Sequence, residues 1–327
     1  MVAGPPEAGI PLVETFLGAQ KGSASELTRD SIAVLGVPHE ETKLSRRGAA
    51  AGPRAIREAT SMFRFAVTEM AGGEVLDIDA RRAYSWRSAP LLDLGDVALG
   101  GELAENMRAI EDALAEITAT GALPVTLGGD HFITYPVLSG VARSLGAAVS
   151  YLHVDMHLDL ADSVPGYGKH ASGTPVRRLL EDGVLAPELV AIVGVEGFQH
   201  RNEWQYGVDA GLEIVSAEAL RGAGIGATLE RLLEQRLGGA PGGVYVSLDI
   251  DVVSRTYAPG TGNAVGTSGL LPAELIALVD QIASWPLAGL DLVEVAPRLD
   301  PTGRTAALAA SALIQALHPR LFEEVPF

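Results

Sequence analysis

The sequence predicts an α/β protein built around a parallel sheet, and two observations support this prediction. Short apolar runs alternate with longer amphipathic stretches between residues 31 and 318. Several of the short runs are apolar at both alternating positions, which is typical of strands covered on both faces. An order in which strand and helix alternate about eight times favours one parallel sheet within a single domain.

The individual elements follow from apolar periodicity and from turn residues. Pro and Gly punctuate residues 1–30, which we expect to form an N-terminal arm, with a single domain over residues 31–327. The expected strands are 31–36, 90–94, 123–127, 148–155, 189–194, 212–216, 243–249 and 287–294. The expected helices lie near 52–66, 101–119, 133–145, 173–183, 217–238, 272–284 and 303–318.

Composition excludes several classes of function. The chain has 24 Lys and Arg against 41 Asp and Glu, and its net charge of −17 argues against nucleic acid or an anionic membrane as a partner. The absence of cysteine excludes thiolate metal sites and a cysteine nucleophile. No apolar run is long enough for a membrane span, and the first residues do not resemble an export signal. We therefore expect a cytoplasmic globular protein.

Carboxylates and imidazoles gather at the carboxyl ends of four expected strands, which is where parallel α/β sheets build their sites. Alternate residues at a strand end share one face, so these side chains should lie close together. They are His131 after 123–127, Asp155, His157 and Asp159 at the end of 148–155, Asp249 and Asp251 at the end of 243–249, and Glu294 at the end of 287–294.

A dinuclear metal site would account for these groups, because buried carboxylates are costly unless they are paired or bound to metal. Four aspartates would balance two divalent cations, and the imidazoles of His131 and His157 would complete six ligands. This donor set suits Mn²⁺, with Ni²⁺, Co²⁺ or Zn²⁺ possible. Such ions generate hydroxide from water. Glu294 would be left to pair with a cationic substrate.

Plainer interpretations exist for each residue taken singly. An aspartate at a strand end is usually a cap or turn residue, and an isolated histidine is usually structural. We interpret His153, which lies deeper in its strand, as structural, and His39, His200 and His318 as ordinary surface or loop residues. The coincidence of four clusters at one sheet edge is what favours a metal site.

Four segments form a pattern in fixed order, namely Gly128-Gly129-Asp130-His131, Asp155-Met156-His157-Leu158-Asp159, Ser247-Leu248-Asp249-Ile250-Asp251 and Ala258-Pro259-Gly260-Thr261-Gly262. These motifs resemble those of the ureohydrolase (arginase/agmatinase) family over roughly residues 30–320. The ending from Asp291-Leu-Val-Glu294-Val-Ala-Pro297 through Gly303-Arg304-Thr305 looks agmatinase-like. The resemblance implies a three-layer α/β/α fold with about eight parallel strands, a dinuclear Mn site and hydrolysis of a guanidino C–N bond. It also implies a homo-trimer or homo-hexamer.

The same resemblance implies residue roles. One metal would be held by His131 and Asp159 and the other by His157 and Asp251, while two further aspartates contact both. These two are Asp155 and Asp249. Asp159 would also orient the attacking hydroxide, and Glu294 would anchor the substrate guanidinium.

The sequence departs from the family pattern near the expected substrate. Many members carry a His-Gly-x-Pro loop whose His helps proton transfer, whereas this chain has Ser172 at that position and His170 two residues earlier. His170 would then substitute for the missing His, with Ser172 contacting the substrate. Asn263 replaces a Thr that is expected to touch the guanidinium.

Agmatine is the first substrate to consider, from the C-terminal motif. The alternatives are formimidoylglutamate, a guanidino acid such as guanidinobutyrate or guanidinopropionate, and guanidine. An acidic tail would need a base, for which the candidates are Lys169, Arg177, Arg178 and Arg255. A non-catalytic partner subunit is a further alternative, whereas the related single-zinc deacetylases lack the complete ligand set seen here.

Overall fold

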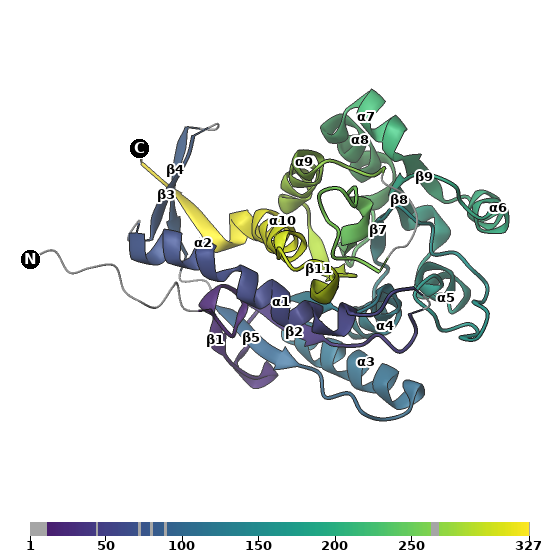
Figure 1. Ribbon diagram of the computed structural model, residues 1–327, viewed down its shortest axis with the longest axis horizontal. Helices are drawn as coiled ribbons and strands as arrows, with labels where there is room; N and C mark the ends of the chain where they lie inside the picture. Colours follow the sequence, from purple (N-terminus) through teal and green to yellow (C-terminus); the bar gives the residue numbers. More distant parts are fainter. Residues whose placement is uncertain are drawn as a thin grey trace, which may run out of the picture.

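The computed structural model describes residues 12–43, 45–70, 73–78, 81–87, 90–262 and 268–326. Its centre is a nine-stranded sheet in the order β1-β5-β2-β6-β11-β10-β7-β8-β9, in which every neighbouring pair is parallel (Figure 1). The strands are β1 (Gln20–Lys21), β2 (Ile32–Val37), β5 (Leu91–Asp96), β6 (Leu123–Gly128), β7 (Ser150–Val154), β8 (Val190–Val195), β9 (Glu213–Ser216), β10 (Val244–Asp249) and β11 (Leu287–Val293).

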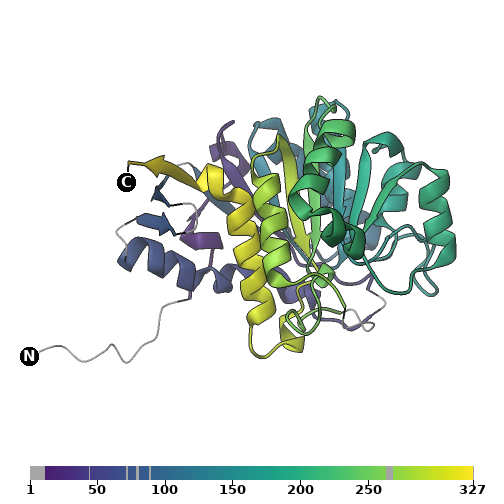
Figure 2. The ribbon, with the colours of Figure 1, turned by 90° about the horizontal axis from the view of Figure 1, so that it is seen from above.

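All eight expected strands are present, with ends shifted by one or two residues. The ninth, β1, has only two residues and was not expected. A second, three-stranded antiparallel sheet in the order β12-β4-β3 was not expected either. It lies beside the large sheet, near the C-terminus (Figures 1 and 2). Its strands are β3 (Glu74–Asp77), β4 (Arg82–Trp86) and β12 (Phe322–Val325).

The helices confirm the expected alternation, with three differences. The expected helices 52–66 and 217–238 are each divided, and α6 forms where only a connection was expected. The α-helices are α1 (Gly52–Ala59), α2 (Ser61–Phe65), α3 (Leu103–Ala119), α4 (Thr134–Leu145), α5 (Pro175–Glu181), α6 (Arg201–Asp209), α7 (Ala217–Ala223), α8 (Ile225–Leu232), α9 (Pro272–Ala283) and α10 (Arg304–Leu321).

Two apolar cores, one on each face of the sheet, make the fold a three-layer α/β/α structure. One core joins α1 and α7–α10 to side chains such as Val125 and Leu152. The other joins α3, α4 and α5 to the opposite face, at Tyr151 and Tyr245 among others. Successive residues of β7 thus enter different cores, as the pleat requires. The predicted fold class is confirmed.

The first described residues pack onto the sheet. Phe16 and Leu17 are fully buried, and the Phe16 N–H donates to Asp93 Oδ2 at 2.7 Å. The division into an arm (1–30) and one domain (31–327) stays a prediction. No helix among the described residues is both long enough and apolar enough to cross a membrane.

Candidate metal centre

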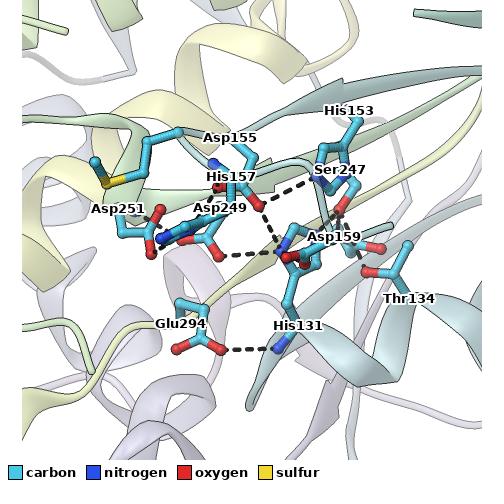
Figure 3. Close-up of polar contacts among 12 residues, drawn as sticks. His131, Thr134, His153, Asp155, His157, Asp159, Ser247, Asp249, Asp251 and Glu294 are labelled. Atoms are coloured by element: carbon cyan, nitrogen blue, oxygen red, sulfur yellow. Dashed lines mark hydrogen bonds and ion pairs between the residues drawn. The ribbon is translucent and has the colours of Figure 1, made fainter. Parts of the chain in front are cut away.

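Four adjacent strands bring the predicted ligands to one edge of the sheet. β6, β11, β10 and β7 are consecutive neighbours in the strand order. Asp249 is in register with Val293, and Leu248 is in register with Val154. The chain therefore leaves the sheet side by side at Glu294, Asp249 and Asp155. In Figure 3, Asp155 and Asp249 both reach the His131 ring, while Glu294 reaches the His131 backbone nitrogen.

His131 is the centre of the first group of ligands. Its Nδ1 lies 3.0 Å from Asp155 Oδ2, 3.1 Å from Asp159 Oδ2 and 3.0 Å from Asp249 Oδ2. All four residues are buried. Three carboxylate oxygens thus converge on one ring nitrogen that can donate at most one proton.

His157 is the centre of the second group. Its Nδ1 lies 3.2 Å from Asp155 Oδ1 and 3.4 Å from Asp251 Oδ2. Asp155 therefore lies between the two histidines and uses one oxygen toward each. The arrangement brings all six predicted ligands together, and the sets His131, His153, Asp155, Asp159 and Asp155, His157, Asp251 each have donor atoms close enough to hold an ion.

The donor set fits two divalent cations. Asp155 Oδ2 and Asp251 Oδ1 are buried and accept no hydrogen bond within the described chain. Such oxygens are costly unless a cation compensates them. Burial, and then repulsion by Asp251 and Asp155, raises the pKa of Asp249 well above its ordinary value. Hard and borderline divalent cations are the natural partners of clustered carboxylates and imidazoles.

The backbone is strained at two of the predicted site residues. Asp159 has φ +50° and Glu294 has φ +70°, in the left-handed region that non-glycine residues rarely adopt. Strain of this kind persists where the surrounding structure holds it and is concentrated at functional sites. Close packing holds the turn before His131 as well, because a Cβ on Gly129 would lie 1.9 Å from His39 O.

Ser247 and Asp291 determine how His131 presents its ring. Ser247 Oγ donates to Asp291 Oδ1 at 2.6 Å and lies 3.0 Å from His131 Nε2. A hydroxyl has one proton, so Ser247 accepts at His131, and His131 carries its proton on Nε2. In the neutral ring the Nδ1 lone pair then faces the carboxylate cluster, as metal binding requires. Tyr245 also donates to Asp291, at 2.8 Å.

His153 lies beside the first group of predicted ligands. Its Nδ1 lies 2.8 Å from the Tyr151 hydroxyl, its Nε2 lies 3.1 Å from Asp155 Oδ2, and its ring stacks on that of His131. If the hydroxyl donates to Nδ1, the proton on Nε2 faces Asp155 Oδ2 at ion-pair distance, without the geometry of a hydrogen bond.

Glu294 has a partner that the sequence interpretation missed. Its Oε1 accepts from the His131 backbone N–H at 2.9 Å, and its Oε2 accepts from Lys43 Nζ. Lys43 and Glu294 are only 5% and 2% exposed. Burial lowers the pKa of Lys43, but the attraction of Glu294 outweighs it, so the pKa is raised. Lys43 lies in the segment that follows β2, and β2 is the neighbour of β6 in the sheet. This position next to the site was the one feature of the sequence that could have pointed to Lys43.

A cavity of about 290 Å³ opens above the centre. Lys43 and Glu294 line it together with His157, Asp159 and Asp251. Further lining residues are Ser45, His131, Ala161, Val164, Ser172, Gly173, Gln199, His200, Glu203 and Asp249. This cavity is where a small substrate would meet the metal centre.

Glu203 is a further buried carboxylate in this cavity, outside the predicted ligands and Glu294. It is 9% exposed, and the described residues give it no ion pair with a lysine or arginine. Burial, followed by repulsion from Asp159, raises the pKa of Glu203 to about 7. It belongs to α6, which the sequence interpretation missed, so nothing pointed to it beforehand.

The remaining predicted site residues lie in different places. Ser172 lines the cavity. His170 does not, because its ring packs against Phe132 and Tyr135, at 5.5 and 6.0 Å between centroids. Asn263 lies outside the described residues.

The basic residues and one histidine also need comment. Arg177, Arg178 and Lys169 lie near Asp162 and Glu181, and neither they nor Arg255 line the cavity. His39, expected to be a surface or loop residue, lies in a loop but not at the surface. It is 3% exposed, because it packs beneath the glycine turn with its Nδ1 3.5 Å from Asp130 Oδ1.

These features define an α/β enzyme class with a two-metal centre at the carboxyl edge of a parallel sheet. Comparison of the chain with known proteins leads to the same class. The sequence model of the arginase family matches residues 30–318. The chain therefore belongs to the arginase family, and it is a C–N hydrolase of the ureohydrolase type acting on small guanidino or amidino substrates.

Three relatives illustrate the range of this family. A mitochondrial guanidino acid hydrolase of Homo sapiens is 36% identical over 287 residues, covering 87% of this chain and 77% of that protein. A mitochondrial agmatinase of Gallus gallus is also 36% identical over 287 residues, covering 87% of this chain and 79% of that protein. The crystal structure of formimidoylglutamase from Bacillus subtilis superposes with a TM-score of 0.82 at 25% identity, covering 100% of this chain and 97% of that chain.

Proposed function

We propose that this chain hydrolyses the C–N bond of a small guanidino or formimidoyl compound at a centre of two Mn²⁺ ions. The convergence of four aspartates and two histidines below a cavity that also contains Glu294 is the observation that supports it most. Ni²⁺, Co²⁺ and Zn²⁺ suit the same donors.

The proposed ligand assignment follows the two groups around the histidines. His131 and Asp159 would hold one ion, and His157 and Asp251 would hold the other. Asp155 and Asp249 would contribute to both, which the position of Asp155 between the two histidines supports. When bound, the ions supply a hydroxide nucleophile near neutral pH and polarise the amidine carbon.

The chain's own residues orient the reaction. Asp159 accepts a hydrogen bond from the attacking water, and Glu294 pairs with the amidinium. The water oxygen bonds to the amidine carbon, the C–N bond to the tail breaks, and a proton moves to the leaving nitrogen. The products are urea and an amine, or formamide and an amine for a formimidoyl substrate. Ser172, Asn263 and His170 remain proposed contributors to substrate binding or proton transfer.

Two kinds of substrate are supported by different features. Agmatine, the first substrate predicted, carries a distal ammonium, and the buried Glu203 carboxylate favours such a group. Formimidoylglutamate and guanidino acids carry carboxylates, and the Lys43 ammonium in the same cavity favours those. Guanidine has no tail. The alternative of a non-catalytic partner subunit predicts metal binding without hydrolysis.

Glu294→Gln tests the amidinium anchor. The substitution keeps the shape of the side chain and removes its charge, so both metals should stay bound while kcat/KM falls by about 100-fold or more. Metal content by mass spectrometry and product release by colorimetry measure the two effects. A Glu294→Gln enzyme with full activity would remove the anchor role.

Assembly and location are also proposed rather than established. We expect a homo-trimer or homo-hexamer, which light scattering on the purified chain would show. We expect a cytoplasmic location, whereas the guanidino acid hydrolase of Homo sapiens and the agmatinase of Gallus gallus are described as mitochondrial.

A further inference from the structure

The Lys43–Glu294 ion pair places a cation beside the carboxylate that would receive the substrate's amidinium. Both Glu294 oxygens already have donors within the chain, one from His131 N–H and one from Lys43 Nζ. Lys43 is the permanent cation among the described residues that line the cavity. The pair as a whole carries no net charge, but it presents one positive and one negative group side by side.

Such a pair is complementary to a zwitterion. A carboxylate on the substrate can bind Lys43 while its amidinium binds Glu294, so that charges of opposite sign alternate among the four groups. A substrate with no carboxylate would instead bring its amidinium next to the Lys43 ammonium, and the single Glu294 carboxylate would then be shared between two cations. In a buried site the repulsion between these cations is weakly screened.

The closeness of the pair limits the length of the substrate. Lys43 and Glu294 are in hydrogen-bond contact, so the substrate's two charged groups must also be close. One carbon between the amidine nitrogen and the carboxylate puts the amidine and carboxylate carbons about 3–4 Å apart, from standard bond lengths. Guanidinoacetate has this spacing, and so does the α-carboxylate of formimidoylglutamate.

We propose that Lys43 selects amidino acids whose carboxylate lies one or two carbons from the amidine nitrogen. This inference rests on the proposed function and adds the substrate class. Lys43 acts as a specificity-determining residue that contacts the substrate, while Glu294 keeps its role as amidinium anchor. Glu203 stays available for a further cationic group.

The test compares substrates and variants on the Mn-loaded protein. The substrates are guanidinoacetate, 3-guanidinopropionate, 4-guanidinobutyrate, formimidoylglutamate, agmatine and ethylguanidine, with urea, formamide and amine measured separately. The wild type should prefer the short amidino acids. Lys43→Met should lower kcat/KM for these by about 10- to 100-fold, the worth of a charge-assisted hydrogen bond, and raise it for ethylguanidine, whose amidinium no longer meets the Lys43 ammonium. Lys21→Met, at an exposed lysine paired with Glu14, is the matched control and should change nothing.

Calorimetric binding of guanidinoacetate and ethylguanidine separates this inference from the proposed function. The role of Lys43 is supported if the wild type binds guanidinoacetate more tightly than ethylguanidine and this preference is lost in Lys43→Met but retained in Lys43→Arg. This holds even if no substrate is turned over. Absent turnover alone would defeat the proposed function but not the role of Lys43 in binding. Equal binding of the two ligands by the wild type overturns the inference, and this comparison needs no variant to fold. A wild-type preference for agmatine, or an equal loss on every substrate in Lys43→Met, also overturns it.

Discussion

At the scale of single residues, the hydrogen-bond chain from Asp291 through Ser247 to His131 decides which ring nitrogen faces the carboxylates. Asp291 is fully buried and accepts from Ser247 and Tyr245, so its position is fixed. Partners of this kind, one step removed from the metal, raise the basicity of a histidine ligand and hold its orientation.

Ser247→Ala should therefore weaken metal binding without removing a ligand. Loss of the hydroxyl frees His131 Nε2 and leaves Asp291 short of a donor, and we expect metal affinity to fall by about 10- to 100-fold. Titration against a competing chelator measures the change. Ser311→Ala, at an exposed position of α10, is the control. Unchanged affinity in Ser247→Ala would show that the ring is oriented by other contacts.

At the scale of elements, the site depends on short turns where strands leave the sheet. The turn after β6 lies against the chain around His39 so closely that residue 129 has no room for a side chain. Glu294 N–H donates to Gly129 O at 2.9 Å, which ties the end of β11 to the same turn. His131 and Glu294 are thus positioned together.

Gly129→Ala should disturb the positions of both His131 and Glu294. A Cβ there would lie 1.9 Å from His39 O, a backbone atom that cannot rotate away. We expect the free energy of unfolding to fall by about 1–3 kcal/mol, as for other overpacked sites, and metal affinity to fall with it. In Gly222→Ala, on α7, the Cβ meets no atom within 4 Å, so stability should be unchanged or rise slightly. Denaturant unfolding compares the two; equal stability would contradict the close packing.

The sequence predicted the sheet and the gathering of the six candidate ligands at its edge for the same physical reason. Strands covered on both faces are continuously apolar, so the polar residues at their ends are conspicuous, as at Asp155 and Asp249. It did not predict α6, whose segment Arg201–Asp209 is polar and gives a weak helical pattern. Lys43 and Glu203 were missed because their positions depend on how connections fold back over the sheet, which periodicity does not encode.

At the scale of the whole molecule, metal binding and folding stability are linked. The apo site gathers carboxylates whose charges repel, and cations would relieve this repulsion. At metal concentrations of 100 times Kd, each site adds about 2.7 kcal/mol to the free energy of unfolding. Two sites should raise Tm on the order of 10 °C, given about 2 °C per kcal/mol in large domains.

The difference in Tm between loaded and metal-free protein should widen as pH rises from about 6 to 8. In the metal-free protein burial lowers the pKa values of His131 and His157, but nearby aspartates raise them well above 6.5 overall. The stability gained from these protonated rings is present below pH 6.5. It is lost as the pH rises toward the pKa values of the two rings in the folded protein. Metal binding has the opposite dependence, because it needs deprotonated rings. Differential scanning calorimetry with Mn²⁺ and with chelator measures Tm against pH for the loaded and the metal-free protein. A Tm difference that stays constant with pH would contradict ligation by these histidines.

The most direct test of the account is product release by protein whose metal content has been counted. Mn-loaded chain is offered agmatine, guanidinoacetate, guanidinopropionate, guanidinobutyrate, guanidine and formimidoylglutamate, and urea and formamide are measured separately. We expect two Mn²⁺ ions per chain and hydrolysis of at least one substrate, and Asp249→Ala should lose at least one ion and nearly all activity. Two bound ions with no product from any substrate would contradict it.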